Sequence, residues 1–68
     1  MTSGDRLTAQ ELQTAILAAA GLSNREIGQR LFLSHRTVSS HLYRIYPKLG
    51  ISGRAQLRTA LDALRQRQ

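Results

Sequence analysis

The chain has 68 residues and a formal net charge of +6, with ten Lys and Arg residues against four Asp and Glu residues. A domain of about 60 residues buries only roughly 60% of its unfolded surface, which leaves one thin core. The sequence has no cysteine, so disulfides and zinc–thiolate sites are excluded as supports. No apolar run approaches the roughly 20 residues of a membrane span, and no signal-peptide pattern is present.

The first helix signal is the spacing of Thr8 and Glu11. A hydroxyl and a carboxylate three residues apart form a capping box, in which each side chain binds the other's backbone N–H. Gly21 is the residue type that most easily ends a helix in the left-handed conformation. We therefore predict a helix over about 9–20. Its core stripe is expected to consist of Leu12, Ile16 and Ala19.

Ser23 and Glu26 repeat the capping-box spacing and predict a short helix over 24–31. Gly28 lies in the middle of this helix, where glycine costs roughly 1 kcal/mol relative to alanine. A glycine at such a position has a packing reason in most proteins. We expect it to allow the close approach of another helix.

Two further N-cap candidates, Ser34 and Ser52, precede apolar residues at helical spacing. They predict helices over about 35–49 and 53–65. No segment alternates apolar and polar residues in the manner of a strand, so the predicted fold is all-α with four helices. The expected core stripes are Val38, Leu42, Ile45 and Leu49 on the third helix, and Leu57, Leu61 and Leu64 on the fourth.

Pro47 is the one proline of the chain and lies near the end of the third predicted helix. Proline has no N–H to donate to the carbonyl of Tyr43, and its ring crowds that carbonyl. We therefore predict that the third helix bends or loosens between Tyr43 and Pro47.

No acid lies between Glu26 and Asp62. This interval forms a basic block, which contains Arg30, Arg36, Arg44, Lys48, Arg54 and Arg58. Opposite its core stripe, the third predicted helix carries hydrogen-bond donors and no carboxylate. Such a face suits phosphate oxygens and base edges, although a solvated basic face is the simpler alternative. The residues on this polar side are Arg36, Thr37, Ser40, Tyr43, Arg44 and Lys48.

Two helices joined by a turn of three or four residues, the second with a polar outer face, form a helix-turn-helix. The segments "LTAQE" and "GLSNREIGQRLFLSHRTVSSHLYRIYPKLGISGRAQL" resemble the LuxR-type (GerE-type) helix-turn-helix domain of bacterial transcription regulators. The resemblance covers about 7–64. It implies a four-helix domain that binds double-stranded DNA in the bacterial cytoplasm, with its third helix in the major groove.

The resemblance also implies which residues contact DNA. Base contacts are expected from Ser39, Ser40 and Tyr43. Many family members carry Lys or Arg at the position of Ser39, so base reading here is expected to depend more on Tyr43 and Arg44, or on water. For His41, packing on the flank of the core is the alternative to a DNA contact. The phosphate-contact candidates are Asn24, Arg25, Ser34, Arg36, Thr37, His41, Arg44 and Lys48.

The resemblance further implies that the fourth helix pairs with its counterpart in a second copy. The alternative is that its alanines are simply good helix formers. Residues 1–6 are expected to be a flexible lead, 7–65 the domain, and 66–68 a frayed end, the whole being the C-terminal output domain of a larger regulator. The dimer-interface candidates are Leu57, Ala60, Leu61, Ala63 and Leu64.

Other functions are disfavoured by the same residues. His35 and His41 do not share a helix face, and no Cys or neighbouring carboxylate completes a metal site. No orienting acid lies near the Ser and His residues, so we expect no enzyme, no cofactor and no small-molecule ligand. Two alternatives remain open: a helix-turn-helix scaffold that docks on RNA polymerase or a regulator, and a σ-factor-like promoter module.

Overall fold

The computed structural model describes residues 7–66, and every regular element in that range is a helix. The prediction of an all-α fold with four helices is confirmed, although the fourth begins with a separate 3₁₀ turn, η2. The expected 1–6 lead and the last two residues of the expected frayed end lie outside the described residues, while Gln66 ends α4. The elements are α1 (Ala9–Ala19), α2 (Asn24–Leu31), α3 (His35–Leu49), η2 (Arg54–Gln56) and α4 (Leu57–Gln66).

Both predicted capping boxes are present. The Thr8 hydroxyl accepts the N–H of Glu11 at 3.1 Å, and the Glu11 carboxylate accepts the N–H of Thr8 at 2.9 Å. Ser23 and Glu26 make the same reciprocal pair at 3.1 and 2.8 Å. These local contacts satisfy backbone donors that have no partner within a helix, and they explain why α1 and α2 begin where the sequence predicts.

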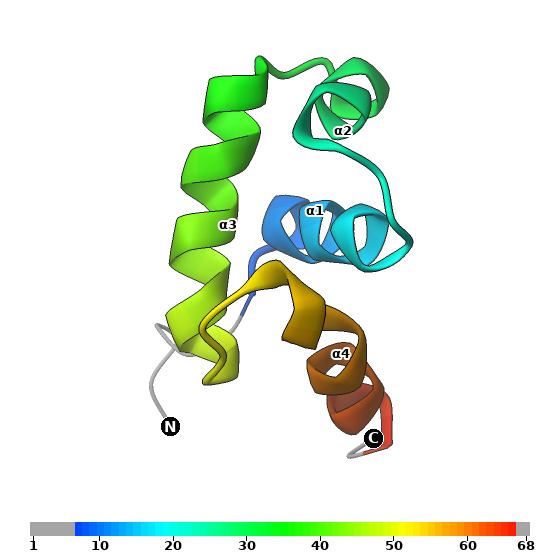
Figure 1. Ribbon diagram of the computed structural model, residues 1–68, viewed down its shortest axis with the longest axis vertical. Coiled ribbons are helices and arrows are strands. Elements are labelled where there is room, and N and C mark those ends of the chain that lie inside the picture. The colour runs from blue at the N-terminus through cyan, green and yellow to red at the C-terminus, as the bar shows by residue number, and fades with distance from the viewer. Residues whose placement is uncertain (1–6, 67–68) are drawn as a thin grey trace.

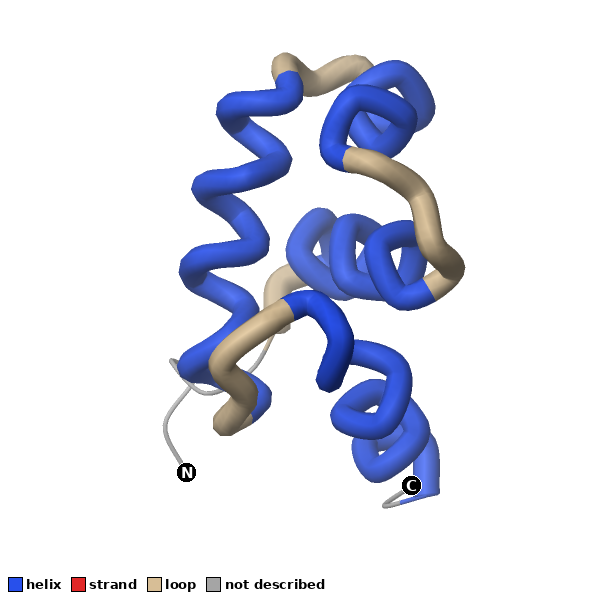
Figure 2. Tube along the Cα trace, viewed as in Figure 1, coloured by secondary structure: helices blue, strands red, loops and turns tan. Residues whose placement is uncertain are grey.

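The four helices pack around one small core (Figure 1). α3 runs along one side of the molecule, and α1 lies between α2 and α4 and contacts all of the other α-helices. The connecting loops are short (Figure 2). The buried apolar residues are Ala15, Ala18, Ile27, Val38, Leu42, Ile45, Leu57 and Leu61.

The predicted core stripe of α1 is wrong. Leu12 and Ile16 are 41% and 50% exposed, and Ala19 is half-buried. The side that faces the core is about a third of a turn away at 100° per residue. Its small side chains allow close approach of the neighbouring helices, and its polar groups have partners. The buried residues of α1 are Glu11, Thr14, Ala15 and Ala18.

Gly28 is buried, which agrees with a role in packing. The expectation that another helix approaches it is wrong, because its close neighbour is the backbone of the following turn. A Cβ atom on Gly28 would overlap the backbone carbonyl oxygen of Leu33. Leu33 belongs to the turn that follows α2, and its N–H donates to the carbonyl of Gly28 at 2.8 Å. Glycine therefore lets the turn fold back tightly onto the helix that it leaves.

Pro47 does not interrupt α3: the helix continues to Leu49 (Figure 1). The predicted loosening is therefore wrong, while the predicted bend between Tyr43 and Pro47 stays a prediction. Pro47 lies in the last turn, where the end of the helix is held by other hydrogen bonds. Gly50, with φ of 69°, donates to the carbonyl of Pro47 at 3.2 Å, and Ile51 donates to that of Tyr46 at 3.0 Å. This pair is the Schellman arrangement, which ties down the last carbonyls of a helix.

Candidate nucleic-acid interface

α2 and α3 form a helical hairpin with a three-residue connection, 32–34. Phe32 ends α2 in the left-handed conformation at φ of 59°, which is uncommon outside glycine. Its N–H and that of Leu33 both donate to the carbonyl of Gly28. The connection is therefore a hydrogen-bonded turn, and it sets the direction in which α3 leaves α2.

Ser34 starts α3 as predicted. Its hydroxyl oxygen accepts the backbone N–H of Thr37 at 3.1 Å and lies 2.9 Å from the Thr37 hydroxyl. Both side chains are phosphate-contact candidates, and both are at the N-terminus of α3. Since the helix dipole is positive there, these two hydroxyls lie where an anionic oxygen is best stabilised.

The outer side of α3 is open to solvent, and its inner side is buried. Val38, Leu42 and Ile45 face the core. The side chains of Arg36 and Arg44 make no hydrogen bond or ion pair within residues 7–66. We call the outer residues the polar face of α3; its members are Arg36, Ser40, Tyr43 and Arg44, all exposed, with the half-buried Thr37 and Ser39 at its margins.

The polar face contains no acid, and Tyr43 is its largest side chain, at 75% exposed. Guanidinium, hydroxyl and phenol groups supply donors over about two and a half turns of one helix. A surface of this kind can bind phosphates through Arg and reach base edges through the shorter hydroxyl side chains. The structure thus brings the predicted base-contact candidates, Ser39, Ser40 and Tyr43, together on one side of α3.

Lys48 lies on the same helix but has a different environment. Its Nζ donates to the Glu11 carboxylate at 2.8 Å, and the two side chains are 23% and 6% exposed. The hydrogen bond from Lys48 is the main reason that the pKa of Glu11 lies below its usual range, and the Thr8 N–H adds to it against the opposing effect of burial. Lys48 thus joins the C-terminal turn of α3 to the start of α1, and its phosphate contact stays a prediction.

His41 is half-buried, and its Nδ1 atom is enclosed without a hydrogen-bond partner in the described part of the chain. The ring is close enough to Glu11 to lower the pKa of that carboxyl further, by a smaller electrostatic effect. This environment agrees with the packing alternative for His41. A phosphate contact through its other ring nitrogen stays a prediction.

Arg25 is exposed at the start of α2, and Asn24 beside it is half-buried. The Oδ1 atom of Asn24 accepts a hydrogen bond from Nη2 of Arg54 at 2.7 Å. The sequence offered no signal for this contact, because the two residues are 30 positions apart. Nor did it reveal that Glu11, a capping residue, is also the partner of Lys48.

The family profile described as bacterial regulatory proteins, luxR family, matches residues 5–61. The chain belongs to the LuxR family. This family consists of transcription regulators and is not a class of enzymes, and its helix-turn-helix domain binds DNA. The hairpin of α2 and α3 has the arrangement of a helix-turn-helix, two helices joined by a short turn.

Curated relatives agree with this assignment. The chain is 49% identical over 51 residues to a protein of Mycobacterium bovis named as an HTH-type transcriptional regulator, covering 75% of this chain and 6% of that protein. It is 42% identical over 52 residues to the transcriptional regulatory protein LiaR of Bacillus subtilis, covering 76% and 25%. The Fimbriae Z protein of Escherichia coli is 41% identical over 51 residues, covering 75% and 24%. No solved structure matches significantly.

The matched part of the chain therefore spans between 6% and 25% of the length of these relatives. Within its described residues, no cluster of three or more His, Cys, Asp or Glu side chains could hold a metal ion. A search for membrane-crossing helices over the same residues found none that is sufficiently long and apolar.

In this LuxR-family domain, two of the predicted dimer-interface residues of α4 lie in the core instead. Leu57 is fully buried and Leu61 is 8% exposed, both in the core of this protomer, so they have little or no surface to offer a second copy. Ala60 is half-buried, and Ala63 and Leu64 are exposed. Of the predicted dimer-interface residues, these three have surface that a second copy could contact.

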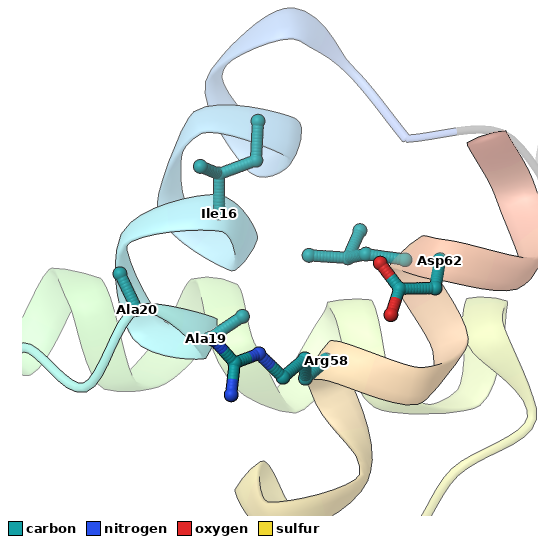
Figure 3. Close-up of a pocket in the computed structure, with 6 residues that line it drawn as sticks. Ile16, Ala19, Ala20, Arg58 and Asp62 are labelled. Atoms are coloured by element: carbon teal, nitrogen blue, oxygen red, sulfur yellow. The ribbon is translucent and has the colours of Figure 1, made fainter.

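A shallow hollow of about 320 Å³ lies at the surface between α1 and α4, which contact each other beside it. In Figure 3, Ile16 and Ala19 of α1 lie across it from Arg58 and Asp62 of α4. Its lining is mainly apolar side chains with one charge of each sign. The hollow lies on α1 and α4, whereas the polar face lies on α3.

Proposed function

We propose that this domain binds double-stranded DNA with sequence specificity by placing the polar face of α3 in the major groove. α2 crosses the sugar–phosphate backbone beside it, as in other helix-turn-helix proteins. The observation that carries this proposal is the exposed row of donors without a carboxylate on α3. The hydrogen-bonded turn and the buried inner side hold that row in one orientation.

The proposed contacts divide by chemistry. Ser39, Ser40 and Tyr43 have side chains that reach base edges over a short distance and read donors and acceptors there. Charged and N-terminal groups bind phosphates, which fixes the register of α3 without reading sequence. The proposed phosphate contacts are Asn24, Arg25, Ser34, Arg36, Thr37 and Arg44, with His41 and Lys48 as additional candidates.

The domain would act as a homodimer whose α4 helices meet through Ala60, Ala63 and Leu64. A twofold dimer places two α3 helices in half-sites about one helical turn apart. Since the relatives are several times longer than this chain, we propose that it is the DNA-binding output domain of a larger bacterial regulator. Such a regulator acts in the cytoplasm, where RNA polymerase is a further partner.

The experiment is selection of preferred duplexes from a random DNA pool, followed by titration of the selected sequence at several salt concentrations. If each protomer contacts about five phosphates, the slope of log Kobs against log salt is about −4 to −5 per protomer. Enrichment of one half-site, repeated with inverted symmetry, would support both base reading and dimerisation. No enrichment together with no salt dependence would favour a scaffold that contacts protein.

A further inference from the structure

Arg54 makes a contact that the helix-turn-helix alone does not explain. It lies in η2, outside the hairpin, and its Nη2 atom donates to Oδ1 of Asn24 at 2.7 Å. Asn24 is the first residue of α2. The guanidinium of Arg54 is thus held at the N-terminal end of the helix that crosses the DNA backbone in a helix-turn-helix.

The charge of Arg54 is not matched by an acid. The residue is half-buried, and its hydrogen-bond partner is a neutral amide. Among the side chains that the structure describes, the one salt bridge joins Lys48 to Glu11. Glu26, the acid closest to Asn24 in sequence, is exposed and receives the Ser23 N–H on its Oε1 atom.

A guanidinium has five N–H donors in a rigid fork. One of them binds Asn24, which orients that side of the group, and the others have no acceptor among the described side chains. A cation that is partly removed from water, oriented by a neutral group and supplied with spare donors suits an anionic oxygen. Arg25, exposed and adjacent to Asn24 in sequence, adds a second positive charge.

We propose that Arg54 binds a phosphate of the DNA backbone, with Asn24 as the residue that positions its guanidinium. This inference rests on the proposed DNA binding and extends its footprint beyond α2 and α3 to η2. The α2 N-terminus itself is not the site, since Ser23 already caps the N–H of Glu26. The ligand is any duplex backbone, because phosphates carry no sequence information.

A purely structural role would be different: the Arg54–Asn24 hydrogen bond would only join η2 to α2. Two variants separate these roles. Arg54→Gln removes the charge and keeps a side-chain amide that can donate to Asn24. Asn24→Ala removes the acceptor and keeps the charge. Arg58→Gln is the matched control, since Arg58 is an exposed arginine of α4 that lines the hollow toward α1.

The measurement is binding of the 68-residue chain to a random-sequence duplex of about one and a half turns, titrated over a range of salt concentrations. We expect Arg54→Gln to reduce the magnitude of the log–log slope by about 0.9 per protomer. Asn24→Ala should weaken binding severalfold with the slope retained, and Arg58→Gln should match the wild type. Should Arg54→Gln not fold by circular dichroism, Arg54→Met gives a second charge-free side chain of similar length.

A wild-type slope in a folded Arg54→Gln or Arg54→Met variant would overturn this inference and leave the proposed function intact. So would an equal loss of slope in Arg58→Gln, since the effect would then come from net charge. Absence of any salt-dependent binding by the wild-type chain would instead overturn the proposed function itself. The two failures are therefore distinguishable in one series of titrations.

Discussion

Arg44 and Lys48 lie one turn apart on α3, yet their surroundings differ. Arg44 is exposed and makes no hydrogen bond or ion pair within residues 7–66. Lys48 is largely enclosed and donates to the buried carboxylate of Glu11. The same helix therefore exposes one cation to solvent and uses the next to hold its own C-terminal turn against α1.

The basic residues of α3 therefore do not form one functional unit. Lys48 is paired within the fold because a carboxylate from α1 is buried beside it, and a buried carboxylate needs a cation or several N–H donors. Arg44 has no such neighbour and stays on the polar face. Net charge predicts a polyanion partner, but the positions of the few acids decide which cations are available to it.

The largest expected effect comes from removing the acid of the ion pair. Glu11→Ala should lower the free energy of unfolding by about 2–3 kcal/mol, somewhat less than for a fully buried pair because Lys48 still reaches water. Urea denaturation of the purified chain measures this loss. Glu26→Ala is the matched control, since it removes the same capping-box contact from an exposed position without breaking an ion pair. Equal losses in the two variants would mean that Lys48 contributes nothing to stability.

Stability should also fall in acid through Glu11. Its pKa in the folded chain lies below the usual value, mainly because Lys48 donates to the carboxylate. A lowered folded-state pKa contributes stability that is fully present above the unfolded pKa and is lost as the pH falls through the folded pKa. We expect the urea midpoint to decline below about pH 5, and Glu11→Gln to decline less steeply over the same range.

Glu26 explains why the urea midpoint of Glu11→Gln should still decline somewhat as the pH falls. The pKa of Glu26 is also lowered, by the hydrogen bonds from Ser23, so the same sign applies to it. Glu26→Gln therefore completes the pH series. Identical pH profiles for the wild type and Glu11→Gln would show that the ion pair with Lys48 does not persist in solution.

The polar face is tested by Arg44→Ala. Loss of one phosphate contact should weaken DNA binding about tenfold, or about 1.4 kcal/mol, and reduce the salt slope by about 0.9. Stability should change by no more than about 0.5 kcal/mol, since Arg44 is exposed. Lys48→Ala should show the opposite pattern, with a larger loss of stability than of salt slope. A loss of stability in Arg44→Ala together with a loss of salt slope in Lys48→Ala would contradict the different roles given to the two residues.

The sequence predicted those parts of the fold whose signals are local. The capping boxes join residues three apart, and the Ser34 cap acts within one helix end, so the starts of α1, α2 and α3 followed directly. The family motif added the hairpin and its outer face. Pro47 misled because the loss of one hydrogen bond in a last turn is outweighed by the contacts that follow it.

What the sequence did not reveal depends on tertiary packing. Lys48 and Glu11 are 37 positions apart, and Arg54 and Asn24 are 30 apart, so no local pattern links them. On α1, the stripe of Leu12 and Ile16 has the larger apolar side chains. The buried side has small ones instead, because alanines let α3 and α4 approach closely.

The smallest expected effect concerns Phe32, which belongs neither to the polar face of α3 nor to the ion pair of Lys48 and Glu11. It is 94% exposed and adopts a left-handed conformation that favours glycine. Phe32→Gly should therefore relieve strain of about 1 kcal/mol, partly offset by the greater freedom of the unfolded chain. The net result should be a small gain or no change in the urea midpoint.

DNA affinity of Phe32→Gly should stay within about twofold of the wild type if the polar face of α3 is bounded by Ser34 and Thr37 at its N-terminal end. Phe32→Asn is the control, since asparagine tolerates the left-handed conformation and keeps a side chain. A loss of affinity in both variants without loss of stability would extend the polar face into the turn. The strained aromatic would then serve binding, because in the folded chain it contributes almost no buried surface.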